Sequence, residues 1–232
     1  MTITENVDFA RERIISAALA AGREPSSVKL LAATKMNEPE AIREAIEAGV
    51  DLCGENRVQE FTAKNEMNAY AGCGVHFIGH LQKNKVKYVV GKVALIHSVD
   101  NVELLREIDR RAASLGVVQD VLAEVNIGGE ASKSGLAVGE LPGFLEAAGQ
   151  FSSVRVQGLM AIPPAEKIPG ENARYFARMY ELYVDIRGKK YDNVKMVELS
   201  MGMSGDYEEA IRYGSTIVRL GTALFGPRNY NT

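Results

Sequence analysis

Short apolar segments of strand length alternate with longer segments of helical periodicity along most of the chain. Several apolar segments, such as Val28–Thr34, lack polar alternation, which is typical of parallel strands whose outer face is covered. Eight segments follow this pattern: Val28–Thr34, Val50–Cys53, Val75–Ile78, Ala94–Ser98, Val121–Ile127, Val154–Ile162, Val194–Leu199 and Ile217–Phe225. The alternation predicts eight parallel strands, each separated from the next by a helical connection.

Start and stop signals for helices lie between these segments. Three starts carry the pattern of a capping box, Asn or Asp followed three residues later by Glu: Asn37 with Glu40, Asp100 with Glu103, and Asp206 with Glu209. Glycines follow the expected helix ends. Two further amphipathic helices are predicted, one at Glu171–Arg187 and one at Ile3–Ala21, before the first strand.

Eight strands alternating with helices predict an α/β fold, a (β/α)8 TIM barrel with an extra N-terminal helix. The alternative is an open, doubly wound sheet, which normally has a glycine-rich turn after its first strand. Here the first strand is followed by Thr34-Lys35-Met36-Asn37, which contains no glycine. The 232 residues are close to the roughly 250 typical of the barrel, so we expect a single domain over residues 1–232.

Composition narrows the class of protein. With 27 basic and 30 acidic residues the net charge is −3, which argues against a nucleic-acid partner or an anionic membrane surface. No segment approaches the roughly 18 apolar residues of a membrane helix, and the polar N-terminus is unlike a signal peptide. The chain has two cysteines, Cys53 and Cys73, expected as free thiols. We therefore expect a cytoplasmic protein.

Active sites of such barrels lie at the carboxyl ends of the strands, and Lys35 stands at the end of the first one. A lysine that loses hydration in a barrel mouth can have a lowered pKa, and a neutral amine can form a Schiff base. The alternative is a lysine whose stem lies along the strand and whose ammonium reaches solvent.

Glycine-rich loops follow the seventh and eighth strands, at Ser200–Gly205 and Gly221–Gly226. This is the usual phosphate site of the fold, because glycines let backbone N–H groups approach an anion. Ser200 and Thr222 could add hydroxyl donors. The alternative is that the glycines only form tight turns.

Two other apparent motifs are set aside. His76 and His80 have the spacing of metal ligands on a helix, but they lie in a predicted strand without a third ligand, so no metal site is expected. The segment 128–134 superficially resembles a nucleotide-binding loop, but Ser132 stands where that loop needs a glycine before its lysine, here Lys133.

A lysine that traps aldehydes and a phosphate cradle in one barrel mouth together suggest pyridoxal 5′-phosphate (PLP). At this point a family resemblance emerges over essentially the whole chain. The motifs that carry it occur in order: Thr34-Lys35, Gly54-Glu55-Asn56-Arg57-Val58-Gln59-Glu60, 76–85, Lys133-Ser134-Gly135, Gly158-Leu159-Met160, 199–206 and Arg219-Leu220-Gly221-Thr222. The sequence resembles the PLP homeostasis protein family (the YggS/PROSC group), whose fold is the barrel domain of alanine racemase.

The resemblance implies the following roles. Lys35 forms the internal aldimine with PLP, and Arg219 approaches the pyridine nitrogen. Ser200, Gly221 and Thr222 hold the phosphate, Asn56 and His80 lie near the ring, and Ser204 is a weaker candidate for the same site. A fixed cation beside the pyridine nitrogen disfavours its protonation, which makes the ring a poorer electron sink. The alternative for Arg219 is an ion pair inside the barrel, with Glu124 or Glu198.

Three functions are compatible with these residues. The first is a non-enzymatic PLP carrier, a monomer that supplies cofactor to PLP-dependent apoenzymes in vitamin B6 homeostasis. The second is a PLP-dependent amino-acid racemase, with Lys35 as one of its two bases. Racemases of this resemblance take the other base from a C-terminal β-domain, and the chain ends at Thr232, so we favour the carrier. The third is a cofactor-free aldolase, whose lysine usually lies on a later strand.

Overall fold

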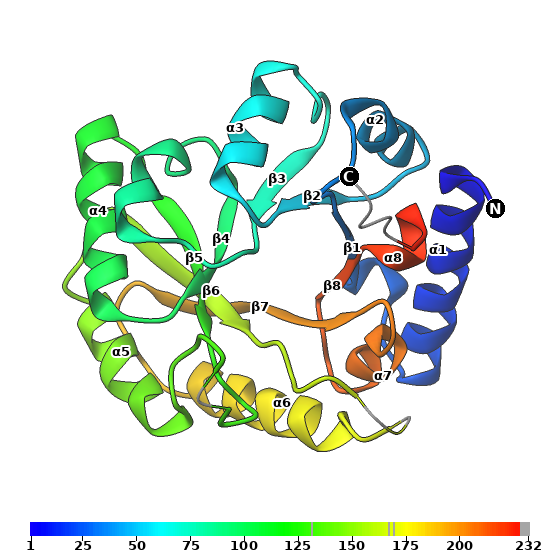
Figure 1. Cartoon of the computed structure of the whole chain (residues 1–232). Coiled ribbons are helices and arrows are strands. Elements are labelled where there is room, and N and C mark those ends of the chain that lie inside the picture. The colour runs from blue at the N-terminus through cyan, green and yellow to red at the C-terminus, as the bar shows by residue number, and fades with distance from the viewer. Residues whose placement is uncertain (131, 167, 169, 228–232) are drawn as a thin grey trace.

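Eight parallel strands close into a barrel in the part of the chain that the computed structural model describes, namely residues 1–130, 132–166, 168 and 170–227. Each strand pairs with the next in sequence and the last pairs with the first (Figure 1). The strands are β1 (Lys29–Ala33), β2 (Leu52–Glu55), β3 (Gly74–Phe77), β4 (Leu95–Val99), β5 (Gln119–Glu124), β6 (Val154–Met160), β7 (Val194–Met203) and β8 (Ile217–Leu220). The predicted (β/α)8 barrel is confirmed, whereas the single-domain range 1–232 stays a prediction that includes positions outside the described residues.

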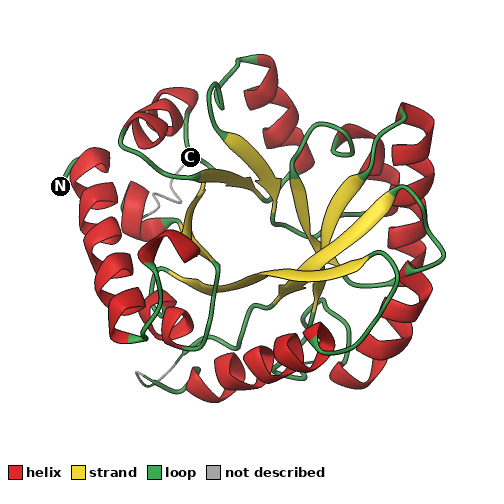
Figure 2. Ribbon diagram, turned by 180° about the vertical axis from the view of Figure 1, so that it is seen from behind, coloured by secondary structure: helices red, strands yellow, loops and turns green. Residues whose placement is uncertain are grey.

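Helices surround the barrel, as Figure 2 shows from behind. The α-helices are α1 (Ile3–Ala20), α2 (Pro39–Glu47), α3 (Val58–Glu66), α4 (Val102–Leu115), α5 (Leu141–Ala148), α6 (Ala173–Arg187), α7 (Tyr207–Arg212) and α8 (Thr222–Phe225). Three 3₁₀ segments are η1 (Pro25–Ser27), η2 (Lys83–Tyr88) and η3 (Val138–Glu140). The connection from β3 to β4 uses η2 in place of an α-helix. No helix in the described ranges is long and apolar enough to cross a bilayer.

The extra N-terminal helix α1 is confirmed, and it lies beside α7 and α8 in Figure 1. Its apolar stripe, which includes Val7, Ala10 and Ile14, is buried against a cluster containing Ile211 and Leu224. Because α8 has only four residues, it leaves part of the outer face of β8 and β1 uncovered. The α1 helix supplies the missing apolar cover, consistent with its 3.6-residue periodicity.

Two of the predicted helix starts are wrong in detail. The N-cap of α2 is Glu38, without a side-chain cap, because Asn37 instead donates from Nδ2 to the Lys35 carbonyl at 3.1 Å. The N-cap of α4 is Asn101 rather than Asp100, and its Oδ1 accepts from the Leu104 N–H at 2.8 Å. Asp206 is the N-cap position of α7, but its side chain makes no capping bond there.

Strand ends also differ from the predictions in ways that matter for the mouth. The eighth segment, expected to continue to Phe225, splits into β8 and the short helix α8. The seventh extends to Met203 through a register shift after Ser200. Gly202 lies in this irregular stretch with φ +92°, and a Cβ there would lie 2.6 Å from the Ala210 Cβ. Glycine is therefore required where β7 bends towards β8.

Candidate functional site

Lys35 follows the end of β1 by two residues, at the carboxyl-end mouth of the barrel. Because β1 pairs with both β2 and β8, the loops after those strands lie on either side of the lysine. Its side chain is partly buried and lines an open cavity with Gly221 and Thr222. The fold therefore places Lys35 in the barrel mouth, where the sequence predicted it.

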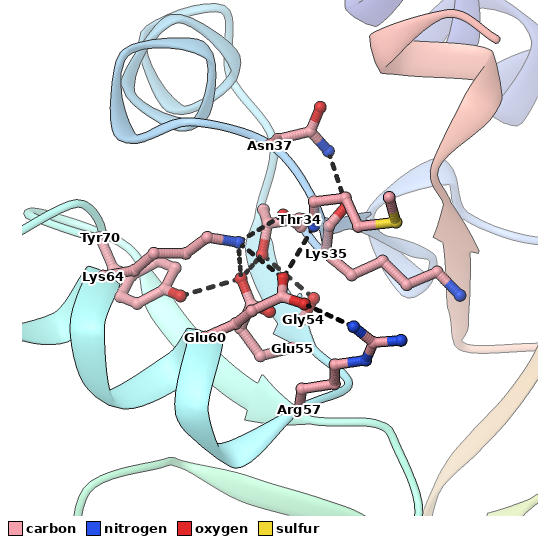
Figure 3. Close-up of polar contacts among 10 residues, drawn as sticks. Thr34, Lys35, Asn37, Gly54, Glu55, Arg57, Glu60, Lys64 and Tyr70 are labelled. Carbon is pink, nitrogen blue, oxygen red and sulfur yellow. Dashed lines mark hydrogen bonds and ion pairs between the residues drawn. The ribbon is translucent and has the colours of Figure 1, made fainter. Parts of the chain in front are cut away.

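A buried polar cluster lies behind Lys35, centred on the Glu55 carboxylate at the end of β2 (Figure 3). Glu55 Oε1 accepts from Lys64 Nζ at 2.9 Å, from the Tyr70 hydroxyl at 2.9 Å and from the Thr34 hydroxyl at 2.6 Å. Glu55 is fully buried and the Lys64 side chain is 10% exposed. Burial and the Glu55 charge raise the pKa of Tyr70, which keeps this hydroxyl a donor.

The same cluster holds the backbone on both sides of Lys35. Lys64 Nζ donates to the Thr34 carbonyl at 2.8 Å, and the Met36 N–H donates to Glu60 Oε2 at 2.8 Å. Met36 has φ +61°, a conformation that non-glycine residues adopt at a cost of order 1–3 kcal/mol and keep only where their surroundings impose it. Figure 3 shows the Lys35 side chain extending away from the cluster. The cluster therefore fixes the turn that aims Lys35.

The opposite wall of the mouth comes from the loops after β7 and β8. Ser204 Oγ accepts from the backbone N–H groups of Gly221 and Ala223, at 3.2 Å each. The Ser204 oxygen thus lies where these two N–H groups could bind an oxygen atom of an anion. Ser204, Gly221 and Thr222 line the cavity together, so the structure brings these three predicted residues into one cradle.

Arg219 lies on β8, lines the same cavity and is 5% exposed. Its Nη2 donates to the Ala161 carbonyl at 2.9 Å, and its Nη1 donates to Ser200 Oγ at 2.6 Å. Burial lowers the pKa of Arg219 to about 10, with the Glu124 and Asp206 charges opposing that shift, so the guanidinium is charged at neutral pH. The alternative pairing with Glu198 does not occur, because Glu198 pairs with Lys29 at 2.5 Å.

Ser200 is not part of the cradle. Its side chain is fully buried inside the barrel, bonded to Arg219 and to His97 Nδ1 at 3.1 Å. The expected phosphate contact through Ser200 does not fit this position, because the register shift in β7 leaves Ser200 below the mouth and brings Ser204 over it.

Asn56 and His80 lie on the far side of the cavity from the cradle. Asn56 lines it directly, and its Oδ1 is buried without a hydrogen-bond partner. Gly79 lets the end of β3 pass close to Asn56, because a Cβ there would lie 2.1 Å from the Asn56 carbonyl oxygen. His80 lines an adjoining lobe with an exposed side chain, and its Nδ1 lies 3.4 Å from the Ser134 hydroxyl.

The cavity has a volume of about 260 Å³ and opens to solvent, slightly below the roughly 300 Å³ at the lower end of small-molecule sites. Glu124, at the end of β5, lines the adjoining lobe. Burial, and to a lesser degree the Asp100 charge, raise the pKa of Glu124 to about 7, against an opposing effect of Arg219. Near neutral pH this carboxyl can both give and take a proton. Within the described ranges, no three His, Cys, Asp or Glu side chains form a metal-binding group.

Reasoning from the sequence missed the residues that position Lys35. Glu55 and Glu60 lie in the quoted segment Gly54–Glu60, and Lys64 follows Glu60 by four residues on α3, the spacing of a helical ion pair. By itself, that spacing is typical of a solvent-exposed pair on a helix. Lys64 instead points into the protein, because its ammonium pairs with the buried Glu55 carboxylate at the end of β2.

Comparisons with known proteins identify the family. The family model "Alanine racemase, N-terminal domain" matches residues 15–229. Pyridoxal phosphate homeostasis proteins of Aquifex aeolicus and Pseudomonas aeruginosa are 46% and 43% identical, over 99% of this chain and 100% and 97% of theirs. An alanine racemase of Clostridium difficile has a TM-score of 0.71 at 16% identity, covering 98% of this chain and 61% of the racemase chain, which is a likeness of fold alone.

Among solved structures, PipY of Synechococcus elongatus with PLP bound has a TM-score of 0.80 and 35% identity, covering 93% of this chain and 99% of PipY. A protein of Bifidobacterium adolescentis has a TM-score of 0.91 and 40% identity, covering 96% and 94% of the two chains. With this identity sustained over whole chains, the protein belongs to the pyridoxal phosphate homeostasis protein family, on the barrel fold of the alanine racemase N-terminal domain.

Proposed function

We propose that this protein binds PLP in the mouth of its barrel and takes part in PLP homeostasis. The observation that carries the proposal is the meeting of Lys35, Arg219, Gly221 and Thr222 around one cavity. An amine, a cation and a set of backbone amides suit the aldehyde, the ring nitrogen and the phosphate of this cofactor. The names of the relatives and the PLP bound to PipY support the same proposal.

The residues of the mouth fit the cofactor, each for a chemical reason. Ser204, Thr222 and the amides of Gly221 and Ala223 would hold the phosphate, since these amides already donate to a hydroxyl oxygen. Asn56 offers a buried acceptor that has no partner among the described residues. When bound, PLP supplies an aldehyde that amines attack and a ring that withdraws electrons.

Lys35 would attach the cofactor. Its amine would bond to the aldehyde carbon, with a C=N bond in place of C=O and the oxygen released as water, the chemistry of a Schiff base. Arg219 would face the ring nitrogen as a donor. Because a neighbouring cation disfavours protonation of that nitrogen, the site would hold PLP without activating it strongly as an electron sink. This disfavours broad carbanion chemistry of the transaminase kind and is compatible with a carrier that supplies PLP-dependent apoenzymes.

A racemase is the second candidate, favoured by Glu124. Its carboxyl, with a pKa of about 7, lines the lobe beside the cavity, and racemisation needs an acid and a base on opposite faces of the substrate carbon. Incubation with L-alanine and PLP tests this candidate. If the wild type forms D-alanine and both Lys35→Ala and Glu124→Gln abolish its formation, the protein is a racemase and the carrier function is wrong.

Borohydride trapping tests the proposed function. The protein is mixed with PLP, reduced and digested, and the modified lysine is identified by mass spectrometry. We expect the phosphopyridoxyl group on Lys35, with visible absorbance before reduction. Lys133→Met is the matched control, because Lys133 lines the adjoining lobe; it should keep the adduct that Lys35→Ala loses. The same adduct on another lysine in Lys35→Ala would overturn the assignment.

Delivery of the cofactor needs a separate assay. PLP-loaded protein is added to a PLP-dependent apoenzyme in the presence of a scavenger of free PLP, and recovery of activity is followed. Recovery no faster than with free PLP at the same concentration would contradict a carrier that hands over its cofactor. The monomeric state and the cytoplasmic location stay predictions, which gel filtration and cell fractionation would test.

A further inference from the structure

Four buried polar side chains form a continuous hydrogen-bonded chain across the barrel interior. Arg219 Nη1 lies 2.6 Å from Ser200 Oγ, Ser200 Oγ lies 3.1 Å from His97 Nδ1, and His97 Nε2 lies 2.9 Å from His76 Nδ1. The residues come from β8, β7, β4 and β3, and none is more than 6% exposed. Closure of the barrel, and no local sequence motif, brings them together.

The chemistry of arginine sets the direction of the first bond in this hydrogen-bonded chain, and the surroundings of Ser200 set the direction of the next. A guanidinium has only N–H donors, so Ser200 Oγ accepts from Arg219. A serine oxygen can accept a second hydrogen bond, but among the described residues the Ser200 hydroxyl has no acceptor other than His97 Nδ1. Its proton is therefore directed to His97 Nδ1, which must be unprotonated to accept it. A neutral His97 ring carries its proton on Nε2 and donates to His76 Nδ1. The proton of His76 is left on its own Nε2.

Both histidine rings are neutral at physiological pH. Burial lowers the pKa of His97 well below its ordinary value, and the charges of His76 and Arg219 act in the same direction. Burial, with a contribution from Lys29, lowers the pKa of His76 to about 4. The ring centroids are 5.0 Å apart with planes inclined by 53°. A tilted edge-to-edge contact of this kind suits an N–H donor facing a ring nitrogen.

We propose that His97 and His76 are positioning residues for Arg219, acting through Ser200 in the fixed donor order Arg219, Ser200, His97, His76. The order holds the Ser200 oxygen as an acceptor for Nη1, while the Ala161 carbonyl accepts from Nη2. The guanidinium is thereby braced from inside the barrel, and its remaining N–H groups are available to the cavity that Arg219 lines.

The protons that form the three bonds of this series, on Arg219 Nη1, Ser200 Oγ and His97 Nε2, are all engaged inside the barrel. The series therefore braces a cation at the mouth but offers none of these protons to a group bound above it. The identity of that group as the ring nitrogen of PLP rests on the proposed function. The donor order itself is a property of the protein without any ligand, so it can be measured separately.

Histidine tautomers in the ligand-free protein test the donor order. The protein contains three histidines, so ¹⁵N-histidine NMR at neutral pH resolves their signals, and the variant His80→Gln identifies the signal of the exposed ring. We expect His76 and His97 to be neutral, each protonated on Nε2. If the His76 or His97 ring is protonated on Nδ1 or is charged, the proposal is overturned. The tautomers are read in the wild type, and His80→Gln serves only to assign the exposed ring.

Two variants of His97 separate positioning from mere core packing. Glutamine can accept from Ser200 with its oxygen and donate to His76 with its nitrogen, so His97→Gln keeps the donor order; His97→Leu removes it. We expect His97→Leu to weaken PLP binding about tenfold, the scale of one lost buried hydrogen bond, and to shift the visible spectrum of bound PLP. His97→Gln should restore both.

Thermal stability is recorded in parallel for the two variants. A His97→Leu protein that is less stable but binds PLP with the wild-type affinity and spectrum would show a purely structural role and overturn the proposal. If the wild type itself fails to bind PLP, the proposed function fails, while the tautomers still decide whether the donor order exists.

Discussion

Lys64 Nζ donates to the backbone carbonyl of Thr34 at 2.8 Å, one residue before the lysine that faces the cavity. The same ammonium pairs with the fully buried Glu55 carboxylate at 2.9 Å and with Glu60 at 3.3 Å. One interior cation therefore joins α3, the end of β2 and the turn after β1. Replacing it affects both the fold and the aim of Lys35.

Lys64→Met should lower the free energy of unfolding by about 3–5 kcal/mol, because it leaves the buried Glu55 carboxylate without its ion pair. Lys189→Met is the matched control: it removes the pair with Asp185, in which the two side chains are 51% and 58% exposed, and should cost at most about 1 kcal/mol. Urea unfolding measures both. Equal losses in the two variants would contradict a special role for the interior pair.

The cluster should also set the reactivity of Lys35. At a temperature where Lys64→Met is folded, we expect slower Schiff-base formation with PLP, because Lys64 no longer holds the Thr34 carbonyl. Stopped-flow absorbance gives the rate, and Lys64→Arg, which keeps a donor cation, should recover part of it. Wild-type rates in a folded Lys64→Met protein would show that the turn holds Lys35 without this contact.

Ser204→Ala should separate phosphate binding from aldehyde binding. The Ser204 oxygen accepts from two amides of the cradle, which leaves its O–H proton to be donated to a bound phosphate. Loss of this hydroxyl should therefore weaken PLP binding about tenfold, the scale of one hydrogen bond to a charged group. Binding of pyridoxal, which has no phosphate, should be unaffected. Ser134→Ala, a hydroxyl beside His80, is the control. Equal losses for PLP and pyridoxal would place the phosphate elsewhere.

Gly202→Ala should destabilise the protein by about 1–3 kcal/mol, the scale of a strained backbone conformation. Gly202 has φ +92°, and the new methyl group would collide with Ala210. Gly205→Ala is the comparison, since a Cβ there meets no heavy atom within 4 Å. Thermal unfolding distinguishes the two. A Gly202→Ala protein as stable as Gly205→Ala would mean that β7 bends without needing glycine.

His76 should make stability depend on pH between about 6.5 and 4. The pKa of His76 falls from 6.5 to about 4 on folding. Between these two pH values, His76 is protonated in the unfolded chain but neutral in the folded protein. Stability is therefore fully present above pH 6.5 and declines as the pH falls towards 4. At about 1.4 kcal/mol per pKa unit, the decline from this residue is about 3 kcal/mol.

Denaturant unfolding across this pH range checks the prediction. In His76→Gln the neutral side chain does not titrate, so the decline with acidification should be smaller by about that amount. Carboxylate titration occurs in both proteins and cancels in the comparison. Parallel curves for the two proteins would show that His76 does not carry the effect.

The two cysteines are closer than their places in the sequence indicate, with Sγ atoms 3.7 Å apart as free thiols. The contact with Cys53 lowers the pKa of Cys73, while the pKa of Cys53 is raised by that contact and by burial. We expect iodoacetamide to alkylate Cys73 first, and more slowly in Cys53→Ala, because the thiolate loses its donor. Mass spectrometry of timed samples measures this. Unchanged rates in Cys53→Ala would contradict the coupling.

The periodicity of the sequence was enough to predict the barrel, because near-continuous apolar strands and amphipathic helices encode burial directly. Periodicity predicted the ends of the strands and helices less accurately. Asn37 has the form of a cap, yet its amide bonds to Lys35 instead. The segment Ile217–Phe225 is mostly apolar apart from Arg219, Gly221 and Thr222, and its periodicity did not separate β8 from the short helix α8.

For the candidate site, the sequence by itself determined which residues stand at strand ends, and so predicted Lys35, Asn56, Gly221 and Thr222 at one mouth. The tertiary structure alone decided how polar groups distant in sequence combine. Barrel closure puts Ser200 beneath Arg219, and the bend of β7 puts Ser204 at the amides of Gly221. Strand order follows from local burial patterns, whereas a buried hydrogen bond depends on register and direction between distant strands, which periodicity does not encode.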